Sequence, residues 1–438
     1  MHHPLRWLVI VALLMEICYG SFYAVPAGPG EVPWLIAVSI VAYLLLGLYF
    51  WRMHGTKRGG RVENRHVLLI IAIGIVFRLT LVPHSVVGSD DIYRYVWDGK
   101  VFASGISPFT YLPADPRLAH LATADLPRLV NHPELRTVYP AFAQVLFCLS
   151  SLMFGDSTVG LKLLLVLLDS CTLIVLYVFL GRRRRERFPV VLYAWSPLPV
   201  LYFGLDGHVD ALGITFLVIA LYFLSTNRNM RGVVALGLSA LAKFVPLVVV
   251  PLTVKHLEGR RRWLLSAVPV VMTAIGFLLY LTPAGGGADA LRTFGERWEF
   301  NGSIFSVVYF LTGSNDAAHM ISILLIALYV AVLALVNRPL LEKVFWAFFG
   351  VILLSPVVHP WYLTWLAALL VLRWSISAFV LLGLSTIANV VVYQYQAYGQ
   401  WVDQPILLLI EYVPVVALLV RELSRGEFLR NEREDIAR

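Results

Sequence analysis

Twelve stretches of the chain are predicted to cross a lipid bilayer as helices, and so many apolar segments leave few other folds open. A spanning helix needs about 20 mostly apolar residues. Of the 438 residues only 14% are charged, whereas soluble domains carry about 25%. We therefore predict an all-α, polytopic transmembrane bundle forming one domain over residues 1–438, and not a secreted, cytosolic or disordered protein. The predicted spans are residues 5–25, 33–52, 67–83, 157–180, 189–204, 208–225, 263–282, 317–336, 343–358, 360–373, 375–393 and 404–420.

Two further apolar segments fit a complete span poorly. Residues 139–155 run into the next span through a turn that holds no basic residue, so we expect a half-helix at the outer interface. Residues 232–254 contain Lys243 and Pro246 in their middle and have basic residues on both flanks, so we expect a hairpin that re-enters from the cytoplasm. Such broken segments are tolerated at membrane depth where they line a cavity.

Basic residues gather between the apolar segments and fix the predicted orientation, because cytoplasmic loops carry an excess of Lys and Arg. The cytoplasmic stretches are then 52–66, 182–187, 226–231, 255–262, 337–343, Arg373 and the tail 421–438. Both termini fall on the same side, and the short loops favour a bacterial cytoplasmic membrane. The net charge of +8 therefore reports topology, and no nucleic-acid partner is expected.

The opposite side of the membrane receives the longest loop, residues 84–138. Loops longer than about 15 residues are usually functional or disordered. This loop is rich in aromatic residues, Pro and Asp, so we predict an ordered catalytic loop outside the cytoplasm. Shorter segments expected on the same side are 205–208, 283–316, 359–361 and 394–403.

Asp90 and Asp91 stand near the start of this loop and precede a short helical pattern. On a helix, Asp91, Arg94 or Tyr95, and Asp98 would share a face. A partly desolvated carboxylate near cations can take a proton from a hydroxyl group. The alternative is an exposed helix N-terminus, for which Ser and Asp are the preferred residues.

Other ionisable residues lie at the outer ends of further spans. His208 and Asp210 follow one short turn, and His359 lies in another beside Trp361 and Tyr362. Lys243 lies inside an apolar hairpin, where an unpaired ammonium is costly and a functional role is the default hypothesis. The structural alternatives are an ion pair of Lys243 with Asp210 or Asp169 and hydrogen-bonded interfacial histidines. Together with the aspartates, these residues predict one cavity.

The stretch 294–312 is expected at the interface, where Arg297 could meet a phosphate; an aromatic belt is the alternative.

The sequence has no Walker A motif, no GxGxxG after a strand and no long hydrophilic domain for a nucleotide sugar. The three cysteines lack metal or disulfide spacing. Adjacent carboxylates can bind Mg²⁺, but no metal or cofactor is predicted. The energy for a group transfer would then arrive on a lipid.

The order of these landmarks resembles the GT-C superfamily of integral-membrane glycosyltransferases, especially the catalytic subunit of GPI mannosyltransferase I and bacterial mannosyltransferases of phosphatidylinositol-mannoside synthesis. The resemblance covers roughly residues 67–373. Its motifs are Ser89-Asp90-Asp91-Ile92-Tyr93, Gly105-Ile106-Ser107-Pro108-Phe109-Thr110-Tyr111, Thr137-Val138-Tyr139-Pro140, Ser196-Pro197-Leu198-Pro199, Asp206-Gly207-His208-Val209-Asp210, Ala242-Lys243-Phe244-Val245-Pro246, Phe300-Asn301-Gly302-Ser303 and His359-Pro360-Trp361-Tyr362.

The resemblance implies an inverting transfer, in which a loop aspartate deprotonates an acceptor hydroxyl and a polyprenyl phosphate leaves the sugar. The base would be Asp90 or Asp91: the helical face favours Asp91, and the family's Asp-x-Asp pattern favours Asp90. The implied phosphate-binding residues are Lys243, His359, Arg94 and Arg297. The implied sugar- or acceptor-binding residues are His208, Asp210, Tyr93, Asn301, Trp361 and Tyr362.

The predicted function is thus transfer of a hexose, by resemblance mannose, from a polyprenyl-phosphate sugar to a lipid-linked or envelope-glycan acceptor. A flippase or other transporter is the main alternative, with Arg78, Asp169, Lys243 and Glu411 supplying a polar path. A non-catalytic assembly subunit would leave the outward cluster unexplained.

Overall fold

The computed structural model describes residues 3–54, 62–257, 259–280 and 287–425. Over these residues the fold is all-α, as predicted, and the backbone pairs as β-structure only in isolated bridges of Phe300 and Asn301 with Val357. Several predicted positions lie outside the described residues. They are Lys57, Arg58 and Arg61 of the basic stretch 52–66, residue 258 of the 255–262 stretch, residues 281–282 of the span predicted at 263–282, residues 283–286 of the outer segment 283–316, and the tail from 426.

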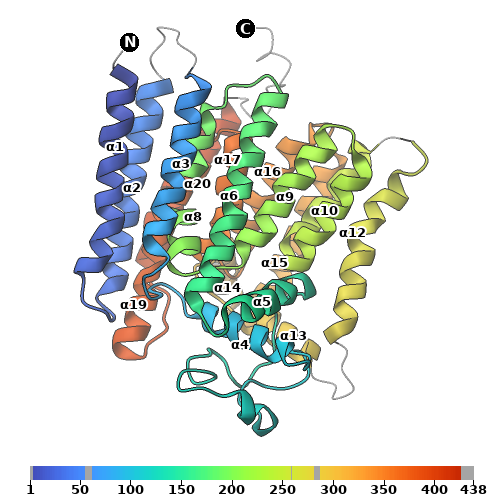
Figure 1. The fold of residues 1–438 in the computed structure, drawn as a ribbon. Coiled ribbons are helices and arrows are strands. Elements are labelled where there is room, and N and C mark those ends of the chain that lie inside the picture. The colour runs from blue at the N-terminus through green and yellow to red at the C-terminus, as the bar shows by residue number, and fades with distance from the viewer. Residues whose placement is uncertain (1–2, 55–61, 258, 281–286, 426–438) are drawn as a thin grey trace.

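Figure 1 shows the helices packed side by side as a bundle, with shorter helices across its lower end. The first ten α-helices are α1 (His3–Gly20), α2 (Glu31–His54), α3 (Asn64–Leu81), α4 (Asp91–Ala103), α5 (Ala141–Phe154), α6 (Thr158–Arg182), α7 (Val191–Ala194), α8 (Pro197–Pro199), α9 (Asp210–Ser225) and α10 (Asn229–Ala242). The others are α11 (Val250–His256), α12 (Arg262–Phe277), α13 (Gly287–Arg297), α14 (Ser303–Thr312), α15 (Asn315–Leu335), α16 (Leu340–Leu354), α17 (Thr364–Leu372), α18 (Ile376–Leu384), α19 (Asn389–Tyr398) and α20 (Pro405–Ser424).

Seven helices of the described chain are long and apolar enough to cross a membrane, and an eighth is counted if one broken pair is a single span. That pair, Phe188–Ala194 and Pro197–Leu205, bends by 42°. The others are Leu5–Ala24, Glu31–Met53, Asn64–Leu81, Thr158–Arg182, Arg262–Tyr280, Asn315–Leu335 and Ile376–Tyr398. They correspond to eight of the twelve predicted spans.

The other four predicted spans, 208–225, 343–358, 360–373 and 404–420, form elements that are shorter or more charged than predicted. The first three are α9, α16 and α17, with 16, 15 and 9 residues. Prolines set two of these limits: Pro339 precedes α16, and Pro360 begins a 3₁₀ turn before α17. The fourth, α20, is 20 residues long but carries three charged residues. Hydropathy alone does not register such interruptions.

The two irregular apolar segments form a short helix and a broken hairpin, as predicted; the side of the membrane on which each lies stays a prediction. The 14-residue α5 lies with α4 across the lower end of the bundle (Figure 1). The chain of the second segment runs down α10, breaks at Lys243 and continues through a 3₁₀ helix (Val245–Val249) into α11. His256 at the end of α11 lies 3.1 Å from the carbonyl of Leu224 near the end of α9, so both arms of the hairpin end at the same side.

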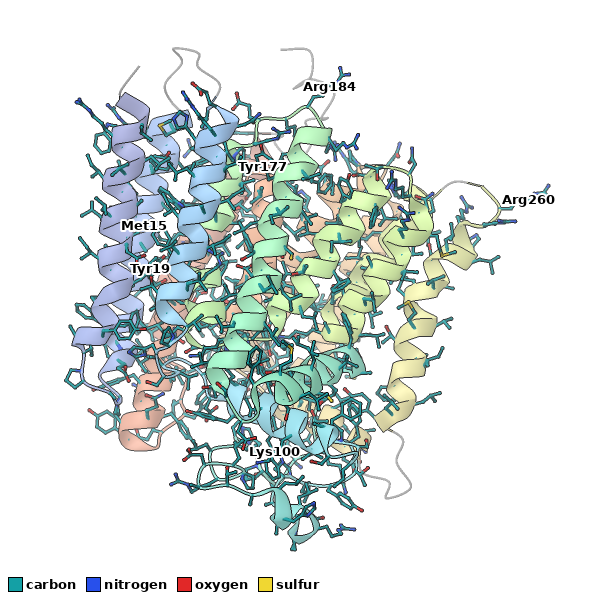
Figure 2. The ribbon with its side chains drawn as sticks, in the orientation of Figure 1. Met15, Tyr19, Lys100, Tyr177, Arg184 and Arg260 are labelled. Atoms are coloured by element: carbon teal, nitrogen blue, oxygen red, sulfur yellow. The ribbon has the colours of Figure 1, made fainter. Side chains whose placement is uncertain are left out.

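Two of the basic stretches predicted to lie on one side of the membrane do lie at the same end of the bundle (Figure 2). Figure 2 shows Arg184 and Arg260, from two separate basic stretches, at the end where α1 begins. Lys100 of α4 lies at the opposite end, together with the long loop that follows it. We name these the basic end and the loop end of the bundle.

A buried ion pair stabilises the break between α7 and α8. The Ser196-Pro197 step interrupts the helix and leaves carbonyl groups without intrahelical partners. Arg78 of α3 donates to the carbonyl of Ala194 at 2.8 Å and pairs with Asp169 of α6; both charged side chains are inaccessible. Arg78 and Asp169 are therefore occupied with each other and with the backbone, rather than lining an open polar path.

Candidate active site

The candidate site lies at the loop end, where the segment before α4 meets the turns before α9 and α17. The α4 helix begins at Asp91, whose amide N–H is 3.3 Å from the Ser89 hydroxyl that caps it. Asp90 stands at the N-cap position, yet its side chain makes no capping hydrogen bond. The helix start thus uses Ser89 and leaves both carboxylates for other contacts, so the N-terminus alternative accounts for only part of this motif.

Asp206, which sequence reasoning did not single out, anchors the chain just before the two aspartates. Its buried carboxylate accepts hydrogen bonds from the backbone N–H groups of Val87 at 2.8 Å and Gly88 at 3.2 Å. Burial raises the pKa of Asp206 to about 6, against these two hydrogen bonds, which lower it. The contact joins residues 118 positions apart, and the only sequence signal for it was membership of the Asp206–Asp210 motif.

Asp90 and Asp91 share one partner, the side-chain amide of Asn131 in the long loop. The amide nitrogen lies 2.9 Å from Oδ1 of Asp90 and 2.7 Å from Oδ1 of Asp91. Burial raises the pKa of both carboxyl groups, and the neighbouring charge of Asp90 raises the pKa of Asp91 further. The Asp91 side chain stays 22% exposed, so it remains reachable.

Lys243 is paired with Asp210, as one of the two structural alternatives predicted. Its ammonium lies 2.8 and 2.9 Å from the carboxylate oxygens of Asp210, and the indole N–H of Trp365 donates to the same carboxylate at 2.6 Å. The ammonium also lies 4.0 Å from the ring centre of Tyr362, within cation–π range. The Lys243 side chain is 25% exposed whereas Asp210 is buried, so Lys243 keeps donor capacity toward the outside of the pair.

His208 and His359 lie on the two faces of Trp361. The ring centres are 4.1 Å apart in both cases, and the planes differ by 16° and 6°. Phe300 stacks on the far side of His359 at 4.4 Å, which completes a column of four rings. We call these residues, His208, Trp361, His359 and Phe300, the ring column.

The surroundings of both histidines of the ring column favour the uncharged imidazole. Burial and the nearby Lys243 ammonium hold the pKa of His208 well below its usual range and lower that of His359 to about 3. Both ring nitrogens of His208 and Nδ1 of His359 are buried without a hydrogen-bond partner among the described residues. Buried polar atoms without a partner are uncommon in proteins. Here they lie near Asp91 and Lys243, whose side chains are partly exposed.

Asn301 fixes the backbone next to Phe300, the last ring of the ring column. It has a positive φ of 53°, and its backbone N–H donates to Asp403 at 2.9 Å. Its side chain donates to Glu411 at 3.0 Å and its carbonyl accepts from Tyr412 at 2.9 Å, both residues of α20. The contacts give Asn301 a structural role beside the proposed acceptor-binding one, because they hold the backbone that carries Phe300.

Only some of the predicted site residues are neighbours in the structure. Asp91 lies 3.8 Å from His208, and Lys243, Asp210 and Tyr362 adjoin them. Tyr93 is half-buried on α4 beside Asp90.

Two predicted phosphate-binding residues make no hydrogen bond or ion pair with this group among the described residues. Arg94 is buried and donates to Asp98 at 2.9 Å and to the carbonyl of Leu135 at 3.0 Å, so it braces the long loop. Arg297 ends α13 with an exposed side chain.

The chemistry available here is proton transfer beside a cation. A partly desolvated carboxylate, Asp91, lies 3.8 Å from His208 and near the Lys243–Asp210 pair. Within the described chain, no three His, Cys, Asp or Glu residues are grouped so as to hold a metal ion. A hydroxyl group could lose its proton to the carboxylate, while an anionic leaving group is stabilised by the ammonium.

Comparison with known families identifies the family of the chain. The family model of the alpha-(1->6)-mannopyranosyltransferase N-terminal domain, MptA/B family, matches residues 22–258. The chain belongs to this family. The match includes both aspartates, Asn131, His208, Asp210 and Lys243, and confirms the resemblance to GT-C mannosyltransferases. No curated protein and no solved structure matches the chain significantly.

Proposed function

We propose that this mannosyltransferase transfers mannose with inversion from a polyprenyl-phosphate donor to a hydroxyl group of a lipid-linked or envelope-glycan acceptor. The observation that carries the proposal is the partly exposed Asp91 carboxylate beside the Lys243–Asp210 pair at the loop end. Asp91 would accept the hydroxyl proton. Lys243 would stabilise the departing lipid phosphate by a charge-assisted hydrogen bond.

The surroundings of the site favour a lipid-borne donor. The α5 helix lies across the loop end and exposes Leu152 (69%) and Met153 (56%). At the same end α14 exposes Phe310 (85%) and Leu311 (75%). Large exposed apolar faces mark contact with membrane or another protein. Next to a bundle of membrane-length helices, they suit the headgroup depth at which a polyprenyl phosphate would lie.

A donor assay tests the proposal. Purified protein in lipid nanodiscs is supplied with radiolabelled mannose on polyprenyl phosphate, with glucose on the same lipid, or with nucleotide-linked mannose. We expect transfer to a membrane-lipid extract from the first donor, with inverted anomeric configuration. We expect none after Asp90→Asn with Asp91→Asn in one chain. Transfer from the nucleotide sugar alone, or full activity of the double variant, would contradict the proposal.

The proposed outer-face location makes a second prediction about sidedness. In a chain whose three cysteines are replaced by alanine, Arg297→Cys probes the loop end and Arg184→Cys probes the basic end, since both side chains are exposed. In intact cells a membrane-impermeant maleimide should label the first and spare the second until the cells are permeabilised. The reverse pattern would place the site in the cytoplasm.

The flippase alternative draws less support from the structure. It requires ionisable groups that line a path through the membrane. Arg78 and Asp169 have inaccessible side chains and satisfy each other, and Glu411 is held by Asn301. Lys243, the fourth residue of such a path, is paired with Asp210 at the loop end.

A further inference from the structure

Asn131 lies in none of the sequence motifs, yet it contacts both aspartates of the proposed site. An amide nitrogen carries two hydrogens, so it can donate one to Oδ1 of Asp90 and one to Oδ1 of Asp91, at 2.9 and 2.7 Å. The amide is neutral and does not titrate. It therefore offers the same two donors at every pH and compensates part of the repulsion between the adjacent carboxylates.

This contact leaves one oxygen of Asp91 available. Oδ2 accepts one long hydrogen bond, from the hydroxyl of Tyr95 at 3.4 Å, and Nδ1 of His208 lies 3.8 Å away, so Oδ2 keeps a lone pair for a further donor. The Asp91 side chain is also 22% exposed. With Oδ1 bound to Asn131 at 2.7 Å, Oδ2 is the oxygen of this carboxylate with the weaker contacts.

The loop holds the Asn131 amide in place from both sides. Val130, the preceding residue, is 4% exposed. The ring of His132, the following residue, packs edge-on against Trp298 with centres 4.7 Å apart. Arg94 donates to the carbonyl of Leu135 at 3.0 Å and ties the same loop to α4. The amide therefore reaches the aspartates from an anchored backbone.

We infer that Asn131 is a positioning residue, which fixes Oδ1 of both aspartates and directs Oδ2 of Asp91 to the acceptor hydroxyl. The inference rests on the proposed function. In the step it serves, the hydroxyl O–H bond breaks and its proton goes to Asp91 Oδ2. The hydroxyl oxygen bonds to the anomeric carbon, and the bond from that carbon to the phosphate oxygen breaks with its electron pair leaving on the phosphate.

The charges around the aspartates determine which pH effect to expect. Donation from Asn131 favours the ionised carboxylates and so opposes the rise that burial causes in the pKa of Asp91. The other titratable groups that face the pair are His132 in the loop, Tyr95 on α4, Tyr139 before α5, Asp206 and His208 before α9, Lys243 after α10 and Tyr362 before α17. None of them takes over the Asn131 contact.

The test compares Asn131→Ala and Asn131→Asp with Arg128→Ala, an exposed residue of the same loop. We expect Asn131→Ala to lose about tenfold to hundredfold in kcat near neutral pH, as for a lost hydrogen bond to a charged group. The acid limb of its pH–rate profile should move to higher pH, so that raising the pH restores part of the activity. Asn131→Asp adds a negative charge and should move the limb further, and Arg128→Ala should behave as the unaltered protein.

A uniform loss at every pH with an unmoved acid limb would overturn the inference, because it would indicate a structural role. A second readout does not depend on turnover: the carboxyl band that disappears in the infrared spectrum of Asp91→Asn is followed against pH. Its titration should shift upward in both Asn131 variants, and an unchanged titration would also overturn the inference. If the unaltered protein transfers no sugar, the proposed function fails, and the infrared titration still decides the role of Asn131.

Discussion

Replacing Asp91 by Asn should abolish nearly all sugar transfer without destabilising the protein. General-base catalysis contributes about 10²- to 10⁴-fold to a rate, and we expect kcat to fall in that range with little change in KM. Asn keeps the shape of the side chain and can still meet Asn131 through its own carbonyl. The single-turnover rate at saturating donor measures this loss directly.

The same substitution should leave the melting temperature unchanged or raise it. Burial and the charge of Asp90 raise the pKa of Asp91 in the folded state above its unfolded value. For an acid shifted in this direction, ionisation penalises the folded state as the pH rises from the unfolded pKa, about 3.9, through the folded one. Above the folded pKa the penalty is complete, and Asn removes it.

The pH–rate profile of the unaltered protein follows from the same shift. A base must be ionised, so activity should disappear as the pH falls through the raised pKa of Asp91, above the usual range of an aspartate.

Asp90→Asn is the matched control, since Asp90 has the same Asn131 partner but no contact with the ring column. We expect it to lose less than tenfold and to move the acid limb downward by removing a like charge. The opposite ranking of the two variants would assign the base to Asp90, as the family's Asp-x-Asp pattern favours.

Much of the site could be predicted because its members stand at the ends of apolar segments. Asp91, His208, Lys243 and His359 are polar residues that interrupt or flank hydrophobic runs, and such interruptions are visible in a sequence. The topology places these ends at one face. Proximity then follows without knowledge of any contact.

Asn131 and Asp206 could not be found by the same reasoning. Asn131 stands in a loop without periodicity, and its contact with Asp91 joins residues 40 positions apart. Asp206 binds backbone N–H groups, which every sequence position offers, so no residue pattern marks its partners Val87 and Gly88.

The structural use of Arg94 could have been anticipated from its spacing. Arg94 and Asp98 stand four positions apart on one helix, a spacing at which opposite charges commonly pair. The structure shows this pair buried. The family resemblance predicted phosphate binding for Arg94 instead. The lengths of α16 and α17 were also less predictable, because short turns at proline end a helix without lowering the mean hydropathy around it.

Lys243→Ala should also cause a large loss of activity. The variant tests the proposed role of Lys243 in binding the leaving phosphate against its structural role as the partner of Asp210. Removing a donor that stabilises developing negative charge typically lowers kcat by about 10²- to 10³-fold. The variant also leaves the Asp210 carboxylate with only Trp365 as a close donor. We therefore expect a stability loss of about 1–3 kcal/mol as well, measured by thermal unfolding in nanodiscs.

The double variant Lys243→Ala with Asp210→Ala distinguishes the two effects. Removing both partners leaves no unpaired carboxylate at position 210, so the thermal stability should largely return to that of the unaltered protein. Activity should not return, because the ammonium facing the phosphate is still absent. Inhibition by added polyprenyl phosphate should weaken in both variants, whereas Lys243→Arg should retain it. Recovery of transfer in the double variant would show that Lys243 serves the fold by neutralising Asp210, and that another cation meets the lipid phosphate.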